Sequence, residues 1–249
     1  MEHPYRFSGR KNIKVYFIHG NLQHPSVWMR FEKELSSIKN RHTEFIYENL
    51  WNSSADSIDA WTDQFCSKVD FNSNTRNILI GYSLGGRLAL HAVLRTPEIW
   101  DSAIVIAAHP GFPTLLEKEQ CLKFDLNWSR RFLTESLNNL FKDWDSQVLF
   151  GGCRCNIERN LSNFDPQLIS KLFIKFSKGK QDYLTPKLLK CSNVPITYIS
   201  GSKDSKYCDI GKTMAQCPSI THKTVPDSCH RVPWENEADF IKIVKGILS

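Results

Sequence analysis

The segment spanning residues 77–94 constrains the fold of this chain more than any other. The apolar run Asn77-Ile78-Leu79-Ile80 is typical of a buried strand, and it leads directly into Gly81-Tyr82-Ser83-Leu84-Gly85. Residues 87–94 follow with helical character. Glycines on both sides of a serine permit the sharp strand-to-helix turn that lifts a hydroxyl above the edge of a sheet. The segment therefore predicts a strand–turn–helix unit with Ser83 as a candidate nucleophile.

Short apolar runs alternate with helical patterns along most of the chain, which is typical of a mostly parallel sheet with helices on both faces. We expect strands at 15–18, 44–47, 77–80, 103–108, 195–199 and 221–225, and helices at 27–38, 58–69, 87–94 and 236–248. Between them, residues 111–190 carry helical fragments and no strong strand signal. The sequence thus predicts an α/β core formed by residues 1–110 and 191–249, with a helical cap at 111–190 inserted between two strands.

Hydropathy and charge exclude some classes of protein. The longest apolar run, residues 103–108, is far shorter than the roughly 20 residues of a membrane-spanning helix. No signal sequence is recognisable, so we expect a cytoplasmic protein that does not partner a membrane. The net charge of +6 is too small to indicate nucleic-acid binding. Within 111–190, Lys and Arg outnumber Asp and Glu by 13 to 9, which indicates either a solvated surface or a basic cover over an anionic substrate.

The eight cysteines show no paired CxxC spacing, so we expect reduced thiols rather than a disulfide framework. Cys153-Arg154-Cys155 is a poor metal motif because no second pair or neighbouring histidine completes a tetrahedral set. We expect neither a metal nor another cofactor.

A serine hydroxyl needs a base before it becomes a nucleophile. Downstream of Ser83 the chain offers His91, His109, His222 and His230. His91 falls inside the predicted helix, and His109 and His222 fall at or within strands. His230 follows the last predicted strand, where the base reaches the serine in this chain order. We predict His230 as the base.

The base in turn needs a carboxylate that fixes its tautomer. Asp204 lies in Gly201-Ser202-Lys203-Asp204, just past the strand at 195–199 and on the expected edge of the sheet. Asp209 and Asp227 are weaker alternatives. We predict the order Ser83, Asp204, His230 for a catalytic triad.

His19-Gly20-Asn21 follows the first strong strand. In this architecture the loop there and the residue after the nucleophile each supply a backbone amide that binds an oxyanion. We assign these amides to Asn21 and Leu84. His19 and Tyr82 are candidate substrate contacts, although a hydrogen bond within its own loop is the favoured role of His19.

With these residues the chain resembles enzymes of the α/β-hydrolase fold over nearly its whole length. It is most similar to the MenH family, whose members eliminate pyruvate to form 2-succinyl-6-hydroxy-2,4-cyclohexadiene-1-carboxylate in menaquinone synthesis. The matching strings are Gly81–Arg87, His109-Pro110-Gly111, Phe141-Lys142-Asp143-Trp144 and Gly201–Lys206. The resemblance implies that Arg87 and Trp144 contact an acidic substrate.

The same resemblance implies further cap arginines that hold substrate carboxylates, and here the chain departs from the family. Their positions fall at Cys121 and near Phe176, neither of which is basic. Among nearby cations, Lys123, Arg130, Arg131 and Lys175 are the candidates to compensate, although lysine does not reproduce the arginine fork.

Three hypotheses of function follow. The first is a serine hydrolase that cleaves a small, anionic carboxylic ester or thioester, either free or attached to an acidic carrier protein. The second is the MenH-type elimination, in which the triad acts as a base and no acyl-enzyme forms. The third is a binding protein on the same fold without turnover, which an intact triad argues against.

Overall fold

The computed structural model describes residues 12–37, 42–151, 157–191 and 193–249. Six strands form one sheet in the order β2-β1-β3-β4-β5-β6, and every neighbouring pair is parallel. The strands are β1 (Asn12–Ile18), β2 (His42–Glu48), β3 (Thr75–Tyr82), β4 (Ser102–Ile106), β5 (Ile196–Gly201) and β6 (Ile220–Val225). The α/β-hydrolase fold predicted from the sequence is therefore confirmed, with a sheet that is wholly parallel.

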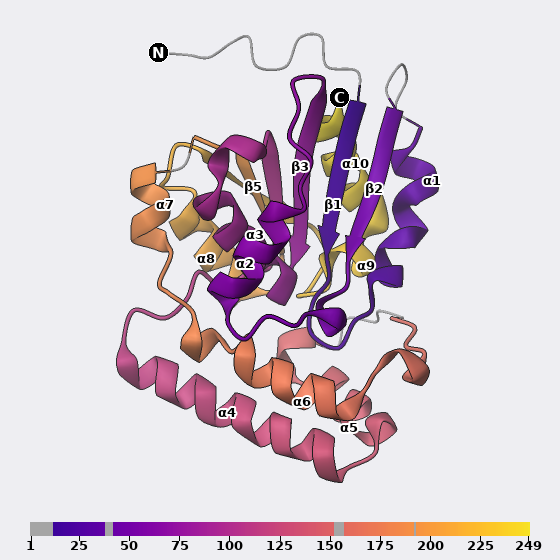
Figure 1. Ribbon diagram of the computed structural model, residues 1–249, viewed down its shortest axis with the longest axis vertical. Coiled ribbons are helices and arrows are strands. Elements are labelled where there is room, and N and C mark those ends of the chain that lie inside the picture. The colour runs from indigo at the N-terminus through magenta and orange to yellow at the C-terminus, as the bar shows by residue number, and fades with distance from the viewer. Residues whose placement is uncertain (1–11, 38–41, 152–156, 192) are drawn as a thin grey trace.

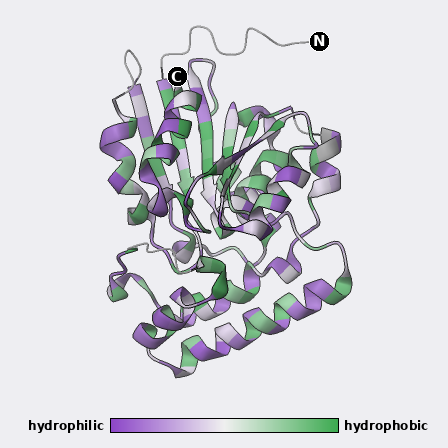
Figure 2. Ribbon diagram, turned by 180° about the vertical axis from the view of Figure 1, so that it is seen from behind, coloured by the Kyte–Doolittle hydropathy of each residue, from purple (hydrophilic) through white to green (hydrophobic). Residues whose placement is uncertain are grey.

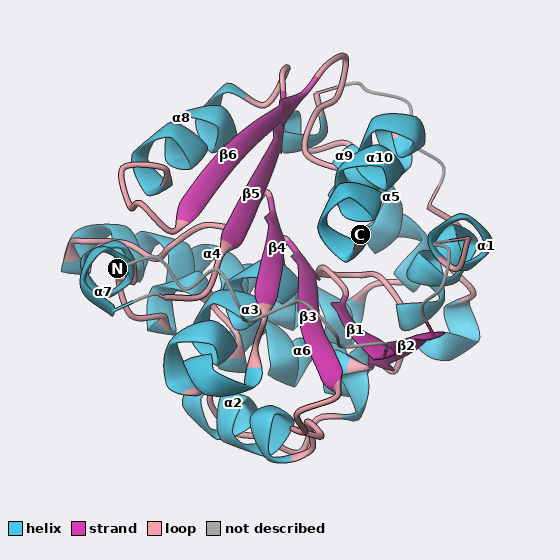
Figure 3. Cartoon of the chain, turned by 90° about the horizontal axis from the view of Figure 1, so that it is seen from above, coloured by secondary structure: helices cyan, strands magenta, loops and turns pink. Residues whose placement is uncertain are grey.

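Helices cover both faces of this sheet, as Figure 3 shows from above. Helices α2 and α3 lie on one face, and α1 and α10 lie on the other. The helices of the core are α1 (Glu32–Leu35), α2 (Ile58–Ser67), α3 (Leu84–Arg95), α8 (Ser205–Met214), α9 (Val232–Glu235) and α10 (Glu237–Leu248). Because the central strands β3 and β4 are enclosed on both sides, every residue in them is buried. Each contains an apolar run, residues 78–80 in β3 and 103–106 in β4, and Figure 2 shows hydrophobic segments along the strands of the sheet.

Aromatic side chains fill the space between sheet and helices. On one face Phe65 stacks between Trp61 and Trp100, with ring centroids 4.8 and 5.9 Å apart. On the other face Trp28 and Phe31 pack with further aromatic side chains, including that of α10. Two apolar clusters, one on each face, therefore hold the sheet rigid, so that the loops at its carboxyl edge start from fixed points.

Among the described residues, four α-helices lie between β4 and β5, in the segment that we expect to form the cap. They are α4 (Leu115–Thr134), α5 (Leu137–Asp145), α6 (Pro166–Lys175) and α7 (Thr185–Cys191). Figure 1 shows α4, α5 and α6 beyond the carboxyl ends of the strands, where a parallel sheet binds its ligands. Trp128 and Phe132 of α4 pack against Phe173 of α6, and a buried hydrogen bond of 2.8 Å joins Ser129 to Ser170. These aromatic side chains belong to the same apolar cluster as those of α2 and α3, so the cap packs continuously onto that face of the core.

Two elements differ from the sequence expectation. Residues 25–31 form a 3-10 helix, η1 (Pro25–Phe31), and only the single turn of α1 continues it within the helix expected at 27–38. Pro25, Trp28 and Phe31 are the buried residues of η1, and a spacing of three matches three residues per turn rather than 3.6. Helix α8 was not expected because its buried residues, Tyr207, Gly211 and Met214, include just two large apolar side chains.

None of the helices in the described ranges combines the length and the apolar character needed to cross a bilayer.

Candidate active site

Ser83 sits on a strained turn between β3 and α3. Its backbone has a φ of 52° and a ψ of −107°, a left-handed conformation that non-glycine residues rarely adopt. The turn requires its glycines, because a Cβ on Gly85 would lie 2.2 Å from the Ile18 carbonyl oxygen and one on Gly81 would lie 2.3 Å from the Gly85 oxygen. The Ser83 amide donates to the Ile106 carbonyl at 2.8 Å, which ties the turn to β4. The hydroxyl is therefore held at the carboxyl edge of the sheet.

The structure brings Ser83, Asp204 and His230 together. The Nε2 atom of His230 lies 3.3 Å from Ser83 Oγ, and Nδ1 lies 2.8 Å from Asp204 Oδ2. Asp204 is 6% exposed and His230 is 1% exposed. A buried carboxylate on Nδ1 holds that nitrogen protonated and leaves Nε2 free to accept the serine proton.

The loops that carry Asp204 and His230 are joined to each other. Lys203 donates its amide to the Ser228 carbonyl at 2.8 Å, and a Cβ on Gly201 would lie 2.1 Å from the Cys229 oxygen. Glu235 then accepts the Cys229 amide at 2.6 Å through Oε2. The sequence reasoning missed Glu235, although a glutamate five residues after the predicted base was visible in the chain.

Burial lowers the pKa of His230 below its ordinary value near 6.5, and the hydrogen bond to Asp204 opposes this. The positive charges of Lys178 and Arg231 lower the pKa further. The imidazole is therefore neutral at physiological pH, the form that a general base requires.

The other three candidate bases, His91, His109 and His222, do not reach the serine. His91 is buried in α3, where burial lowers its pKa to about 4. His109 packs on Phe112, with a pKa lowered to about 3 by burial and by nearby cations. His222 is hydrogen-bonded to Ser200 at 2.8 Å. Among these four candidates, His230 is the one whose ring nitrogen lies within hydrogen-bond distance of Ser83.

The loop after β1 lies against the start of α3. A Cβ on Gly85 would meet the carbonyl oxygens of both Ile18 and His19, so the two backbones are in close contact. The Gly20 amide is occupied by the Gln23 side chain at 2.9 Å, whereas the Asn21 and Leu84 amides donate no hydrogen bond within the described residues. The loop after β1 and the start of α3 lie at the point where the strand order reverses, and the assignment of these two amides to an oxyanion hole stays a prediction.

His19 braces the loop after β1, and its contact with a substrate stays a prediction. The side chain is fully buried; Nδ1 lies 2.9 Å from the Gly20 carbonyl, and Nε2 accepts the Leu50 amide at 3.1 Å. Burial lowers the pKa of His19 to about 4, so the ring stays neutral. The favoured role, a hydrogen bond within its own loop, agrees with this geometry.

Arg87 is engaged by residues of the cap, and its contact with a substrate stays a prediction. Its guanidinium is buried beneath the cap, where Nη1 donates to Gln181 Oε1 at 2.8 Å and Nη2 donates to the Phe176 carbonyl at 2.6 Å. Both terminal nitrogens are thus engaged by the cap. In the structure Arg87 ties α3 of the core to the segment after α6.

Tyr82 packs beside His230, and Trp144 packs among aromatic side chains of the cap. The ring of Tyr82 is buried 5.5 Å from that of His230 and 5.0 Å from that of Trp234. Trp144 packs edge-on against Trp128 at 5.1 Å and extends toward Phe150, whose ring lies 5.9 Å from His230. Any contact of Tyr82 or Trp144 with a substrate stays a prediction.

A cavity of about 730 Å³ lies between the cap and the loop after β5. Of the three predicted triad residues, Asp204 is the one that lines this cavity. Tyr207 lines it as well, and its ring lies 4.5 Å from that of His230. Three lysines line this cavity, namely Lys178, Lys203 and Lys206. Its apolar lining includes Phe112, Phe124, Val148 and Leu149.

Lys178 is the cation that the sequence reasoning missed. It belongs to η6 (Lys178–Lys180), lines the cavity beside Cys121, and has no ion-pair partner within the described part of the chain. The residues expected to compensate for the missing arginines lie elsewhere: Lys123 and Arg130 are exposed, Arg131 pairs with Glu135 and Asp143, and Lys175 donates to Ala55. No local sequence pattern identifies Lys178 as a residue of the cavity, because its position there depends on how the chain turns after α6.

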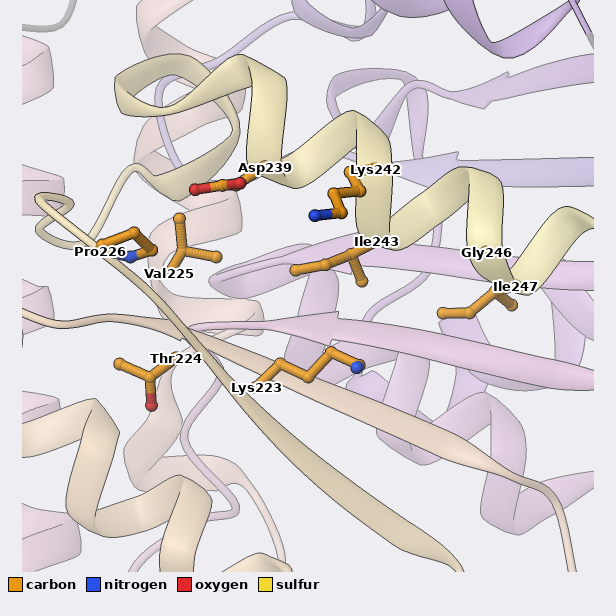
Figure 4. A pocket seen from close by; sticks show the side chains of 9 residues that line it. All are labelled: Lys223, Thr224, Val225, Pro226, Asp239, Lys242, Ile243, Gly246 and Ile247. Atoms are coloured by element: carbon orange, nitrogen blue, oxygen red, sulfur yellow. The ribbon is translucent and has the colours of Figure 1, made fainter.

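A second groove, shown in Figure 4, lies between β6 and α10 and measures about 670 Å³. Lys223, Lys242 and Asp239 line it together with apolar side chains of α10. None of its lining residues belongs to the triad or to the loop after β1, so the candidate active site lies elsewhere.

The cysteines depart in part from the expectation of reduced thiols. Cys66, Cys121, Cys208 and Cys217 are free, as expected, but Cys229 is disulfide-bonded. Cys153 and Cys155, considered as a metal motif, lie outside the described residues.

Comparisons with known proteins agree with this architecture. A profile of the α/β-hydrolase fold family matches residues 14–237. The 2-succinyl-6-hydroxy-2,4-cyclohexadiene-1-carboxylate synthase of Escherichia coli O1:K1 is 28% identical over 200 residues, covering 78% of this chain and 77% of that protein.

Solved structures show the same fold. MenH from S. aureus superposes with a TM-score of 0.81 at 20% identity, covering 94% of this chain and 92% of that one. A carboxylesterase structure from Nitrososphaera gargenis gives a TM-score of 0.71 at 16% identity, covering 95% and 89%. With its parallel sheet, strained serine turn and family match over residues 14–237, this chain is an enzyme of the α/β-hydrolase fold family.

Proposed function

We propose that this protein is a serine hydrolase that cleaves a small, anionic carboxylic ester or thioester. The observation that carries the proposal is the continuous hydrogen-bonded chain from Ser83 through His230 to Asp204. The Asn21 and Leu84 amides complete the machinery as the oxyanion hole. This set of groups is what acyl transfer to a serine requires.

In the proposed reaction, Ser83 Oγ attacks the substrate carbonyl carbon while His230 Nε2 takes its proton. The two amides stabilise the negative charge that develops on the carbonyl oxygen. The C–O or C–S bond then breaks, and His230 gives its proton to the departing alcohol or thiol. Water, deprotonated by His230, attacks the acyl-enzyme and releases the acid. Asp204 fixes the orientation and tautomer of the His230 imidazole and stabilises its cationic form.

The proposal of an anionic substrate is supported by the lysines of the cavity. Lys178, Lys203 and Lys206 all face one space beside Asp204, and Glu117 is the sole acid there besides Asp204 itself among the described lining residues. The field of Lys178 reaches His230, since it contributes to lowering the pKa of that residue. An acyl group that carries a carboxylate, either free or delivered by an acidic carrier protein, would be attracted to this space.

A paired substrate screen tests the proposal. p-Nitrophenyl esters of a dicarboxylic acid and of a neutral acid of equal length are offered to the wild-type protein and to Ser83→Ala. We expect turnover by the wild type alone, with a higher kcat/KM for the acidic ester. Equal, slow release of p-nitrophenol by both proteins would overturn the hydrolase proposal.

The MenH-type elimination is the second candidate function, and the names of the relatives favour it. Here His230 and Ser83 act together as a base, and no acyl-enzyme forms. Against it stand the engaged guanidinium of Arg87 and the cysteine at position 121. Release of pyruvate from the menaquinone precursor by the wild type but not by Ser83→Ala, without ester cleavage, would favour this function.

A further inference from the structure

Asp145, the last residue of α5, binds two arginines that approach it from different parts of the chain. Its Oδ2 accepts from Arg159 Nη1 at 2.7 Å, and its Oδ1 accepts from Arg159 Nη2 at 2.9 Å. The same Oδ1 also accepts from Nη2 of Arg231, the residue that follows His230. One cap carboxylate therefore joins the cap to the loop that carries the proposed base.

Arg159 has a second partner, in the loop after β1. Its Nε donates to the carbonyl oxygen of Leu22 at 2.7 Å. Leu22 is fully buried, has a φ of 53°, and directly follows Asn21. A left-handed leucine is strained and needs contacts that hold it. Arg159 supplies one such contact, to the carbonyl group of Leu22. Leu22 is the residue after Asn21, whose amide is a proposed oxyanion donor.

Arg231 acts on the opposite side of the triad. Its guanidinium carbon lies 3.7 Å from the ring centroid of Phe150, and that ring meets His230 edge-on at 5.9 Å. With Asp145 fixing the guanidinium, Phe150 is held between Arg231 and the imidazole. The two arginines thus contact both the oxyanion loop and the base loop.

In the cluster of Asp145, Arg159 and Arg231 the two arginines are largely buried, so the loss of one of the three charges would destabilise the other two. The side chains of Arg159 and Arg231 are 8% and 7% exposed. Although burial opposes ionisation of Asp145, the hydrogen bonds and charges of the two arginines lower the pKa of this carboxyl below its ordinary value. Removing the carboxylate would leave two buried guanidinium groups without their shared anion, which is costly.

We propose that Asp145 and Arg159 are positioning residues that hold the Asn21 amide in the oxyanion hole. The cap, besides covering the site, thereby sets the geometry of the catalytic edge. This inference rests on the proposed hydrolase function, because it assigns the Asn21 amide to the oxyanion.

Two variants weaken the contacts among Asp145, Arg159 and the Leu22 carbonyl while keeping side chains of similar size. Asp145→Asn keeps the shape and loses the charge, while Arg159→Lys keeps the charge but has a single nitrogen, which cannot bind Asp145 twice and also reach the Leu22 carbonyl. The matched control is Asp143→Asn, on the same helix, where Asp143 pairs with Arg131 on the cap surface.

We expect kcat to fall by about tenfold to a hundredfold in Asp145→Asn and Arg159→Lys, because a displacement of roughly 1 Å at a catalytic group has effects of this size. KM should change little, since neither side chain lines the cavity. A trifluoromethyl ketone inhibitor, whose adduct carries the oxyanion, should lose affinity in proportion to kcat/KM. The control should retain wild-type kinetics and inhibition.

Hydrogen exchange of the peptide spanning residues 17–24 gives a readout that does not depend on turnover. We expect faster exchange in both variants and unchanged exchange in Asp143→Asn. Wild-type exchange in folded variants, or a kcat equal to that of the wild type, would overturn the inference. If the wild type neither turns over esters nor binds the inhibitor, the hydrolase proposal fails, while exchange still decides whether Asp145 and Arg159 hold the loop.

Discussion

At the scale of single residues, the state of His230 controls the proposed chemistry. Burial, Lys178 and Arg231 favour the neutral ring, and Asp204 favours the charged one. The net effect lowers the pKa of His230, so the ring remains neutral, and able to accept a proton, at pH values where a free histidine would already be charged.

This shift predicts the acid limb of the pH profile. Protonation of His230 inactivates it, and since its pKa in the folded protein lies below 6.5, kcat/KM should stay level from pH 8 down to about 6.5 and fall only at lower pH. Initial rates on a neutral ester, measured in buffers of constant ionic strength, check this. A limb centred above pH 7 would contradict the account.

Lys178 offers a second test at this scale. Lys178→Gln removes a cation near His230 and from the cavity. We expect the acid limb to move to higher pH and KM for an acidic ester to rise by about tenfold, the effect of losing one charge-assisted hydrogen bond. Lys180→Gln, at an exposed position two residues away, is the control and should change neither quantity. Equal effects of the two variants would leave Lys178 without a specific role.

At the scale of elements, the turn between β3 and α3 is the most demanding part of the structure. It needs a positive φ at Ser83 and no side chain at Gly85, because α3 begins in contact with the end of β1. The two requirements are met by residues two positions apart in one short motif.

Gly85→Ala should therefore disrupt both stability and activity. The added Cβ would lie 2.2 Å from a backbone oxygen of β1, which neither backbone can accommodate without moving. Gly246→Ala in α10 is the matched control: nothing lies within 4 Å of its new Cβ, and alanine favours a helix over glycine by about 1 kcal/mol. Thermal unfolding should show a lower Tm for Gly85→Ala and an unchanged or higher Tm for Gly246→Ala.

Much of the core and the meeting of the triad could be predicted from the sequence because their signals are local. Buried parallel strands such as β3 and β5 appear in the sequence as largely apolar segments, and Ser83 and Asp204 follow these two strands. His230 follows the half-exposed edge strand β6. Lys178, Asp145 and Arg159 could not be predicted in the same way. Their partners are set by how the cap folds onto the core, and no short pattern encodes the contact of Arg159 with Leu22, 137 residues away.

At the scale of the whole molecule, buried neutral histidines link stability to pH. Burial lowers the pKa of His19 and His91 to about 4 and, aided by nearby cations, that of His109 to about 3. In the unfolded chain these groups take up protons near pH 6.5, well before they do so in the folded protein. The folded state therefore loses stability as the pH falls below 6.5.

Urea denaturation measures this effect. The free energy of unfolding should be nearly constant from pH 8 to 7 and should decline steadily from pH 6.5 toward pH 4. His91→Leu, which removes one buried titrating group, should make that decline shallower. A stability that rises on acidification through this range would contradict the buried, neutral state of these histidines.

The central claim is that Ser83 is a nucleophile activated by His230 and Asp204, and covalent labelling with a fluorophosphonate tests it most directly. Intact-protein mass spectrometry should show one adduct per wild-type chain, mapped to Ser83 by peptide analysis. Ser83→Ala should show none, and His230→Ala should react far more slowly. An unlabelled wild type that is folded by circular dichroism, or an adduct that persists in Ser83→Ala, would contradict the account.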